Sequence, residues 1–258
     1  MVPQVSSRTN RFDDFFRDQS YIILKNHLYN YTLRKSAVSG SLETGSGATL
    51  EIGSGMSPVL ISKGRAVYCD VSFAALQILR STLNRGLYVV ADCTELPFKE
   101  GSFANAVCSE VLEHVEGDRK AVGEIARILT SHGCLVLTFP HRQIYFSHDD
   151  RFVHHLRRYE LDEMKTILKD SGFTIIKVGK VLGLVEKAVM IPATFMARAF
   201  QPARPAQKNA RGGVASSRVF ISCFALLNRF LALLARLDAA ATPLRYATVL
   251  MIKAKKGE

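Results

Sequence analysis

At Thr49–Pro58 the chain reads Thr-Leu-Glu-Ile-Gly-Ser-Gly-Met-Ser-Pro, a short apolar run with an acid at Glu51 that breaks into a turn with two glycines. Gly53 and Gly55 allow backbone conformations and a close ligand approach that a Cβ atom would block. Pro58 suits the first turn of a helix. The stretch therefore predicts the first strand of a parallel sheet, followed by a nucleotide-binding loop.

A second apolar run, Val67-Tyr68-Cys69-Asp70, ends in a carboxylate 19 residues after Glu51. In a doubly wound sheet, an acid at this distance lies at the tip of the next strand, where it can accept hydrogen bonds from both hydroxyls of a ribose. The full GxGxxG pattern of dinucleotide sites is missing after Gly55. A loop with fewer glycines, preceded by an acid, favours a nucleoside that carries a charged amino-acid group.

Strand and helix signals alternate from residue 48 onward, which predicts a parallel sheet with right-handed crossovers. The fold class is α/β, a doubly wound, mostly parallel seven-stranded sheet with an α-helical insertion before the last strand. Strands are expected at 48–52, 66–70, 87–91, 104–109, 133–139, 173–178 and 248–252. Helices are expected at 58–62, 72–84, 117–130 and 160–171, with one or two more within 11–35.

Four regions are expected along the chain: a helical cap at 1–43, a nucleoside-binding core at 44–180, a helical insertion at 181–246, and the final strand and tail at 247–258. The cap either covers the ligand or packs on the sheet. Met1 to Asn10 has no apolar core, so no secretory signal is expected. The five cysteines lack metal-ligand spacing and suit small buried residues in a reducing cytoplasm.

Two further segments complete a resemblance to a known family. Ala91-Asp92-Cys93-Thr94-Glu95-Leu96-Pro97-Phe98 looks like the third-strand segment of the Rossmann-like class I S-adenosylmethionine (SAM) dependent methyltransferases, and 103–115 looks like their fourth strand and the turn after it. With the glycine loop and Asp70, the resemblance covers roughly residues 46 to 178. It extends to the broad ubiquinone and menaquinone methyltransferase group, and it implies SAM as the cofactor.

The resemblance also implies roles for individual residues. Glu51, Gly53 and Gly55 would line the methionine end of the cofactor, and Asp70 would take the ribose hydroxyls. The adenine would meet Asp92 with Cys93. Glu110 would lie near the sulfonium. In this chemistry the enzyme mainly aligns the nucleophile, the methyl group and the sulfur.

Glu110-Val111-Leu112-Glu113-His114 places two carboxylates and an imidazole at i, i+3 and i+4, so that all three point the same way if the segment is helical. His114 is then a candidate general base. The spacing also resembles the divalent-metal site of the small-RNA 2'-O-methyltransferases and of some quinone O-methyltransferases, with His155 as the further ligand beside Glu110, Glu113 and His114. A purely structural role is the third alternative.

Downstream of the fifth expected strand, His154-His155-Leu156-Arg157-Arg158-Tyr159 falls where this fold usually shapes its acceptor pocket. Two histidines with two arginines predict an anion-friendly rim, which suits an acceptor with a phosphate, diphosphate or carboxylate. His155 is counted among the catalytic candidates with Glu110 and His114. The alternative is a solvated loop and helix cap.

The net charge of +11 is concentrated near the C-terminus, because residues 187–258 hold 12 Lys and Arg against 2 Asp and Glu. Within 214–237, the arginines Arg218, Arg229 and Arg236 fall within about 20° of one line on a helix, facing a wide apolar remainder. Three alternatives stay open for this segment. It packs on the core, lies in the interface of an anionic membrane, or spans the bilayer at the cost of three charges.

The sequence as a whole predicts a cytoplasmic SAM-dependent methyltransferase, peripheral on the inner face of the membrane. Its acceptor is either lipid-soluble (a quinone precursor, lipid or lipid-linked sugar) or a small anionic metabolite. Nucleic acid is disfavoured, because the basic surplus is interleaved with Leu, Phe and Ala rather than with stacking aromatics and Gly. The rival from another class is a catalytically silent SAM-binding protein that regulates or scaffolds at the membrane.

Overall fold

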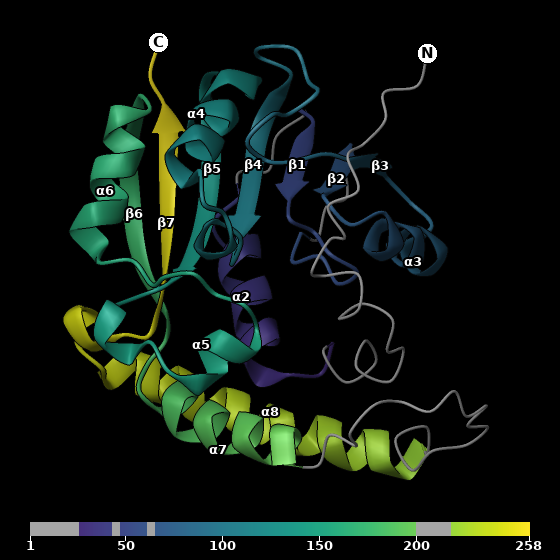
Figure 1. The fold of residues 1–258 in the computed structure, drawn as a ribbon, viewed down its shortest axis with the longest axis vertical. Coiled ribbons are helices and arrows are strands. Elements are labelled where there is room, and N and C mark those ends of the chain that lie inside the picture. Colours follow the sequence, from purple (N-terminus) through teal and green to yellow (C-terminus); the bar gives the residue numbers. More distant parts are fainter. Residues whose placement is uncertain (1–25, 43–46, 61–64, 200–217) are drawn as a thin grey trace.

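In the computed structural model, a seven-stranded sheet has the order β3-β2-β1-β4-β5-β7-β6 (Figure 1). Of the 258 residues, the structure describes 26–42, 47–60, 65–199 and 218–258. Strand β7 is inserted antiparallel between β5 and β6, while the pairings from β3 through β5 are parallel. The strands are β1 (Thr49–Ile52), β2 (Ala66–Asp70), β3 (Leu87–Val90), β4 (Phe103–Ser109), β5 (Leu129–Pro140), β6 (Phe173–Leu182) and β7 (Val249–Lys256). The expected α/β fold class is confirmed.

Helices cover both faces of the sheet. One face carries α4 (Asp118–Ile128) and α6 (Leu161–Asp170), and the other carries α2 (Tyr29–Ser39) and α3 (Phe73–Leu83). Helix α4 is amphipathic, and its apolar positions are buried against the sheet. Helix α3 begins where the Ser72 side chain accepts from the Ala75 amide, and it ends at Asn84 in a left-handed conformation.

The helix expected at 58–62 does not begin where the sequence places it. Residues 58–60 are not helical, and 61–64 lie outside the described part of the chain, as do residues 11–25 of the expected N-terminal helices. Between β4 and α4 lies only a single 3-10 turn, η2 (Leu112–His114). Strand β5 begins at Leu129, four residues earlier than expected, because it follows directly on α4.

The long connection from β6 to β7 forms α7 (Val185–Ala199) and α8 (Arg218–Ala241). Both lie at the end of the molecule toward which β1, β2 and β4 point, below α2 and the short α5 (His148–Phe152) (Figure 1). Among the described residues, no helix combines the length and apolarity needed to cross a membrane. Residues 200–217, which include the basic side chains of Arg204, Lys208 and Arg211, lie outside the described residues.

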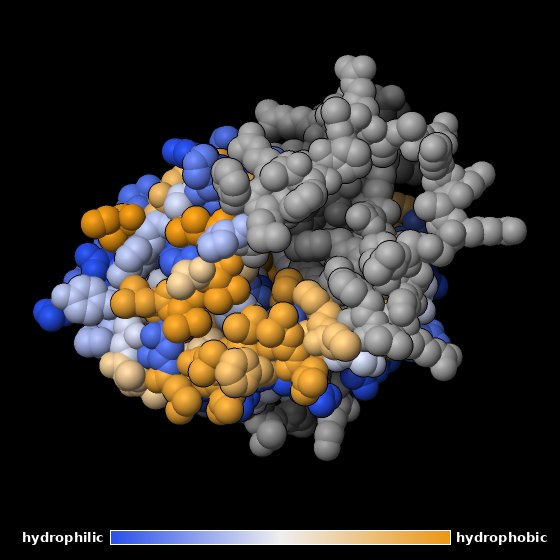
Figure 2. All heavy atoms as spheres, turned by 90° about the horizontal axis from the view of Figure 1, so that it is seen from below, coloured by the Kyte–Doolittle hydropathy of each residue, from blue (hydrophilic) through white to orange (hydrophobic). Residues whose placement is uncertain are grey.

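Helix α8 buries a narrow stripe of small and polar side chains, Asn228, Ala235 and Ala239. Most of its large apolar side chains point to solvent, with Leu226 69%, Phe230 58% and Leu237 60% exposed. Figure 2, which views the molecule from below, shows hydrophobic residues gathered over this end. We call this the α8 apolar face, made of Leu226, Leu227, Phe230, Leu233, Leu234 and Leu237.

Asn228 attaches α8 to α2. Its Oδ1 accepts the backbone N–H of Tyr29 at 3.0 Å, and its Nδ2 donates to the backbone O of Phe224 at 3.0 Å. The Tyr29 amide belongs to the first turn of α2, where helical amides have no partner inside the helix. Asn228 therefore satisfies a buried donor that would otherwise be left unpaired.

Replacing Asn228→Ala should lower the free energy of unfolding by about 1–3 kcal/mol, because a buried N–H loses its acceptor. Urea unfolding followed by circular dichroism measures the change. Ser222→Ala, at an exposed position of the same helix, is the matched control and should leave stability within about 0.5 kcal/mol of the wild type. Equal stability of the two variants would show that α8 does not depend on this contact.

Candidate active site

The glycine loop takes the conformation that its sequence requires. Gly53 and Gly55 have φ values of 67° and 53°, in the left-handed region that favours glycine. At Gly53 a Cβ atom would also collide with the side chain of Val111, which follows β4. The tip of β4 therefore packs directly on the loop, and glycine at 53 is needed for both reasons.

Asp70 ties the tip of β2 to this loop. Its Oδ2 accepts the backbone N–H of Gly55 at 2.7 Å, and its Oδ1 accepts that of Ser72 at 2.9 Å. A carboxylate offers about four acceptor positions, so the contacts with these two amides are compatible with the expected ribose contact. The side chain lies on the wall of the cavity described below, as the ribose assignment requires.

Glu51 also holds backbone. Its Oε1 accepts the N–H of Val59 at 2.8 Å and its Oε2 that of Leu60 at 2.9 Å, and the residue is buried. The Tyr31 hydroxyl of α2 donates to the backbone O of Pro58 at 2.7 Å in the same segment. Glu51 thus shapes the segment after the glycines, in addition to bordering the cavity where the methionine end was expected.

A cavity of about 650 Å³ opens at the carboxyl ends of the parallel strands. Ligands of open α/β sheets bind at this edge. Its wall includes every residue expected to bind the cofactor, namely Glu51, Gly53, Gly55, Asp70, Asp92, Cys93 and Glu110. The volume lies within the range of pockets for small molecules and cofactors.

Asp92 and Cys93 form the part of the wall that follows β3. Asp92 Oδ1 accepts from both the backbone N–H and the hydroxyl of Thr94 at 2.8 Å, which fixes the turn. Burial, with a smaller effect of the Asp92 charge, raises the pKa of the Cys93 thiol to about 12. The thiol stays protonated, so Cys93 offers an apolar surface rather than a nucleophile.

Helix α2 supplies a residue that sequence patterns did not indicate. Arg34 lines the cavity, and its Nη1 lies 3.6 Å from Glu110 Oε2. Its Nε is buried and has no hydrogen-bond partner among the residues that the structure describes. No motif in the sequence connects Arg34 to the glycine loop, because only the folded α2 brings it there.

Glu110 does not lie beside Glu113 and His114, as its spacing in the sequence had predicted. Its φ of 56° is left-handed, so 110–114 is not one helical turn and its side chain does not follow those of Glu113 and His114. Glu110 Oε1 instead accepts from the hydroxyl of Thr138 at 3.2 Å. Glu110 remains on the cavity wall, near Arg34 rather than near the histidines.

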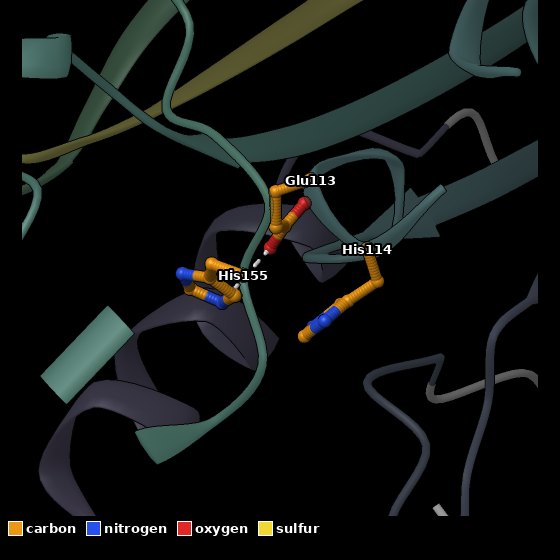
Figure 3. A group of neighbouring side chains, drawn as sticks. All are labelled: Glu113, His114 and His155. Atoms are coloured by element: carbon orange, nitrogen blue, oxygen red, sulfur yellow. Dashed lines mark ion pairs between the residues drawn. The ribbon is translucent and has the colours of Figure 1, made fainter. Parts of the chain in front are cut away.

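Glu113, His114 and His155 come together beside the cavity (Figure 3). Glu113 is fully buried, and neither carboxylate oxygen has a hydrogen-bond partner within the described parts of the chain. Burial, and then the charge of Glu110, raises the pKa of Glu113 well above its usual range. The rings of His114 and His155 are 4.7 Å apart, and both line the cavity.

The expected anion-friendly rim is only partly formed. His154 and His155 border the cavity, but neither Arg157 nor Arg158 is part of its wall as the described residues define it. Arg158 is buried and donates from Nε to Asp150 at 2.8 Å, and Arg157 pairs with Asp118 at 3.0 Å. The prediction for the arginines was wrong because Asp150 and Asp118 are buried and need the arginines as counter-ions. The sequence does not indicate that these two acids are buried.

The fold and the glycine loop define a nucleoside-binding α/β domain, and comparison with known proteins gives its class. Residues 45–137 match the family of methyltransferase domains. A probable SAM-dependent methyltransferase of Mycobacterium tuberculosis is 29% identical over 111 residues, which is 42% of this chain and 40% of that protein. Residues 45–137 therefore form a methyltransferase domain of the SAM-dependent class, and SAM is the cofactor that this class uses.

Solved structures agree on the fold. A Haloferax volcanii protein, solved with the Trm112 methyltransferase activator, superposes with a TM-score of 0.65 at 15% identity, over 96% of this chain and 98% of that one. A phosphoethanolamine N-methyltransferase of Haemonchus contortus, solved with SAM, gives a TM-score of 0.56 at 16% identity, over 96% of this chain and 60% of that one. The ubiquinone and menaquinone subgroup stays a prediction.

Asp70→Asn should weaken binding of SAM about 10- to 100-fold, because hydrogen bonds to a charged acceptor contribute about 1.5–3 kcal/mol. Isothermal titration calorimetry with SAM measures the change. Asp162→Asn, at an exposed position of α6, is the matched control and should bind SAM like the wild type. Wild-type affinity in a folded Asp70→Asn protein would remove Asp70 from the cofactor site.

Proposed function

We propose that this protein transfers a methyl group from SAM to a lipid-soluble acceptor at the surface of an anionic membrane. The observation that carries the choice of acceptor is the α8 apolar face, which lies at the cavity end of the molecule. A small anionic acceptor is the second candidate, and His154 and His155 on the cavity wall support it. The two acceptor classes can be distinguished by extraction, because a methylated lipid enters the organic phase and a methylated anionic metabolite stays in the aqueous phase.

The residues on the cavity wall suit SAM. When bound, SAM supplies the methyl group and a sulfonium leaving group, so the protein mainly binds and orients the reactants. Asp70 would hold the ribose, and Asp92 with Cys93 would border the adenine. Arg34, whose buried Nε has no hydrogen-bond partner in the described part of the chain, would bind the carboxylate of the methionine moiety, and Glu110 beside it would face the positive sulfonium.

His114 is the side chain best placed to take a proton from the acceptor. Its Nδ1 lies 3.2 Å from the backbone O of His154. A proton held there leaves the lone pair on Nε2, the atom that would act as the base. His155 would assist from the same wall of the cavity.

The charge around the α8 apolar face supports an anionic bilayer as its partner. Arg229 and Arg236 are exposed, and at about 100° per residue both lie about 90° from the buried stripe, along one edge of the apolar face. Arg245, also exposed, follows on η5 (Leu244–Tyr246). Helices of this kind lie in the membrane interface with the apolar side in the acyl region and the basic residues at the head groups.

Helix α2 lies between α8 and the cavity. Asn228 of α8 holds the N-terminus of α2. The next residues of that helix, Asn30 and Tyr31, line the cavity together with Leu28 before it and Leu182 of β6. Helix α2 is therefore in contact with α8 and also forms part of the cavity wall, which supports an acceptor that arrives from the membrane side.

Vesicle binding tests the membrane surface. The full chain should co-sediment with phosphatidylglycerol vesicles, and Leu226→Ser with Phe230→Ser should weaken binding at least about tenfold, since each buried side chain contributes about 1.5–3 kcal/mol. Arg229→Gln and Arg236→Gln should each cost about fivefold, at about 1 kcal/mol per basic residue. Phe73→Ser on α3, 67% exposed in the wild type, is the matched control. Equal binding by all variants would refute this role of α8.

Transfer of label tests the activity. Incubation with methyl-labelled SAM and an extract of the source cells should place label in the organic phase, and Asp70→Asn should strongly reduce it when SAM is limiting. Label in the aqueous phase would favour the small anionic acceptor, and label in nucleic acid would identify a nucleic-acid methyltransferase. Bound SAM without any label would favour the catalytically silent regulatory or scaffold protein.

A further inference from the structure

We propose that Glu113, His114 and His155 bind a divalent transition-metal ion at the wall of the cavity. Each residue offers one ligand atom, and these atoms all lie within 4.8 Å of one another (Figure 3). The proposal concerns binding alone and does not rest on the proposed methyl transfer; with an ion bound, His114 would be a ligand and not the base. It differs from the set that the sequence suggested, because Glu110 is turned toward Thr138 and Arg34.

The carboxylate of Glu113 is the strongest indication of a cation. The residue is 0% exposed, and neither oxygen accepts a hydrogen bond from any residue that the structure describes. Buried polar groups are nearly always satisfied, and a buried carboxylate without donors is costly. A metal ion would satisfy one or both oxygens at once.

His155 is oriented as metal-binding histidines usually are. Its Nδ1 lies 2.8 Å from Asp150 Oδ1, and its Nε2 lies 3.6 Å from Glu113 Oε1. Asp150 is itself held by Arg158 at 2.8 Å and by Lys187 at 3.0 Å. A carboxylate on one ring nitrogen fixes the tautomer so that the other nitrogen can donate to a metal.

The distances require only small adjustments. With metal–ligand bonds of about 2.1 Å, tetrahedral ligand atoms lie about 3.4 Å apart, close to the 3.6 Å between His155 and Glu113. His114 would close the remaining gap by side-chain rotation. Two imidazoles with one carboxylate favour zinc, cobalt or manganese over magnesium and calcium, which prefer oxygen ligands.

Three protein ligands would leave at least one coordination position for a water or another oxygen ligand. His114 and His155 line the cavity, whereas Glu113 lies behind them. The open position would therefore face the cavity. An oxygen bound there would be made more acidic by the ion.

Metal binding is tested on the full chain without an affinity tag, after treatment with a chelator. Titration with Mn²⁺ followed by electron paramagnetic resonance should give one bound ion per chain, and Co²⁺ should give d–d absorption bands typical of nitrogen ligation. Glu113→Gln and His155→Asn should each weaken Mn²⁺ binding at least about tenfold, given that loss of even an outer-shell partner typically costs 10- to 100-fold. His132→Asn, at an exposed histidine outside the cluster, should bind like the wild type.

Circular dichroism checks that each variant folds. If the Glu113 or His155 variant does not fold, Mn²⁺ binding by His114→Asn tests the proposal instead. Absence of a bound ion in the wild type, or equal binding by all folded variants, would overturn the proposal. In that case the contacts of His155 with Asp150 and Glu113 account for the cluster without an ion. SAM affinity, measured separately, distinguishes this failure from a failure of the proposed function.

Discussion

The binding site depends on two carboxylates that hold backbone amides at the tips of adjacent strands. Asp70 accepts from Gly55 inside the glycine loop, and Glu51 accepts from Val59 and Leu60 just after it. Each acid therefore satisfies buried donors that the turn would otherwise leave unpaired. The loop can adopt left-handed conformations near a ligand because its two ends are fixed in this way. Both acids have a structural role before any cofactor is bound.

Much of the fold follows from local sequence patterns. Short apolar runs near Glu51 and Asp70, with helical spacing between the later runs, predict the positions of the strands along the chain closely, and every expected cofactor residue lies on one cavity. Features that depend on tertiary contacts could not be predicted. Arg34 reaches the site only through the packing of α2, and Arg158 turns inward because Asp150 is buried. The assigned roles in cofactor binding and catalysis stay predictions.

A buried ionic network connects the insertion to the site. Lys187 of α7 contacts Asp149 and Asp150 of α5 at 2.8 and 3.0 Å, and Asp150 also holds His155. Burial opposes ionisation of Asp150, but its hydrogen bond with His155 and the charges of Arg158 and Lys187 outweigh burial and hold its pKa well below the usual range. The position of a cavity histidine is therefore fixed in part by α7.

Helix α8 reverses the usual arrangement of an amphipathic helix that covers a core. Such a helix buries its largest apolar residues, whereas α8 packs Ala235, Ala239 and Asn228 against the protein. Small side chains allow close approach to the protein and leave the six side chains of the α8 apolar face on the outside, while Leu231 is partly buried against the core. Contiguous exposed apolar surface is rare on proteins that act alone and marks contact with a membrane or a partner. The sequence alone indicates that the helix is amphipathic, but the structure identifies which side is buried, and it is the side with the smallest residues.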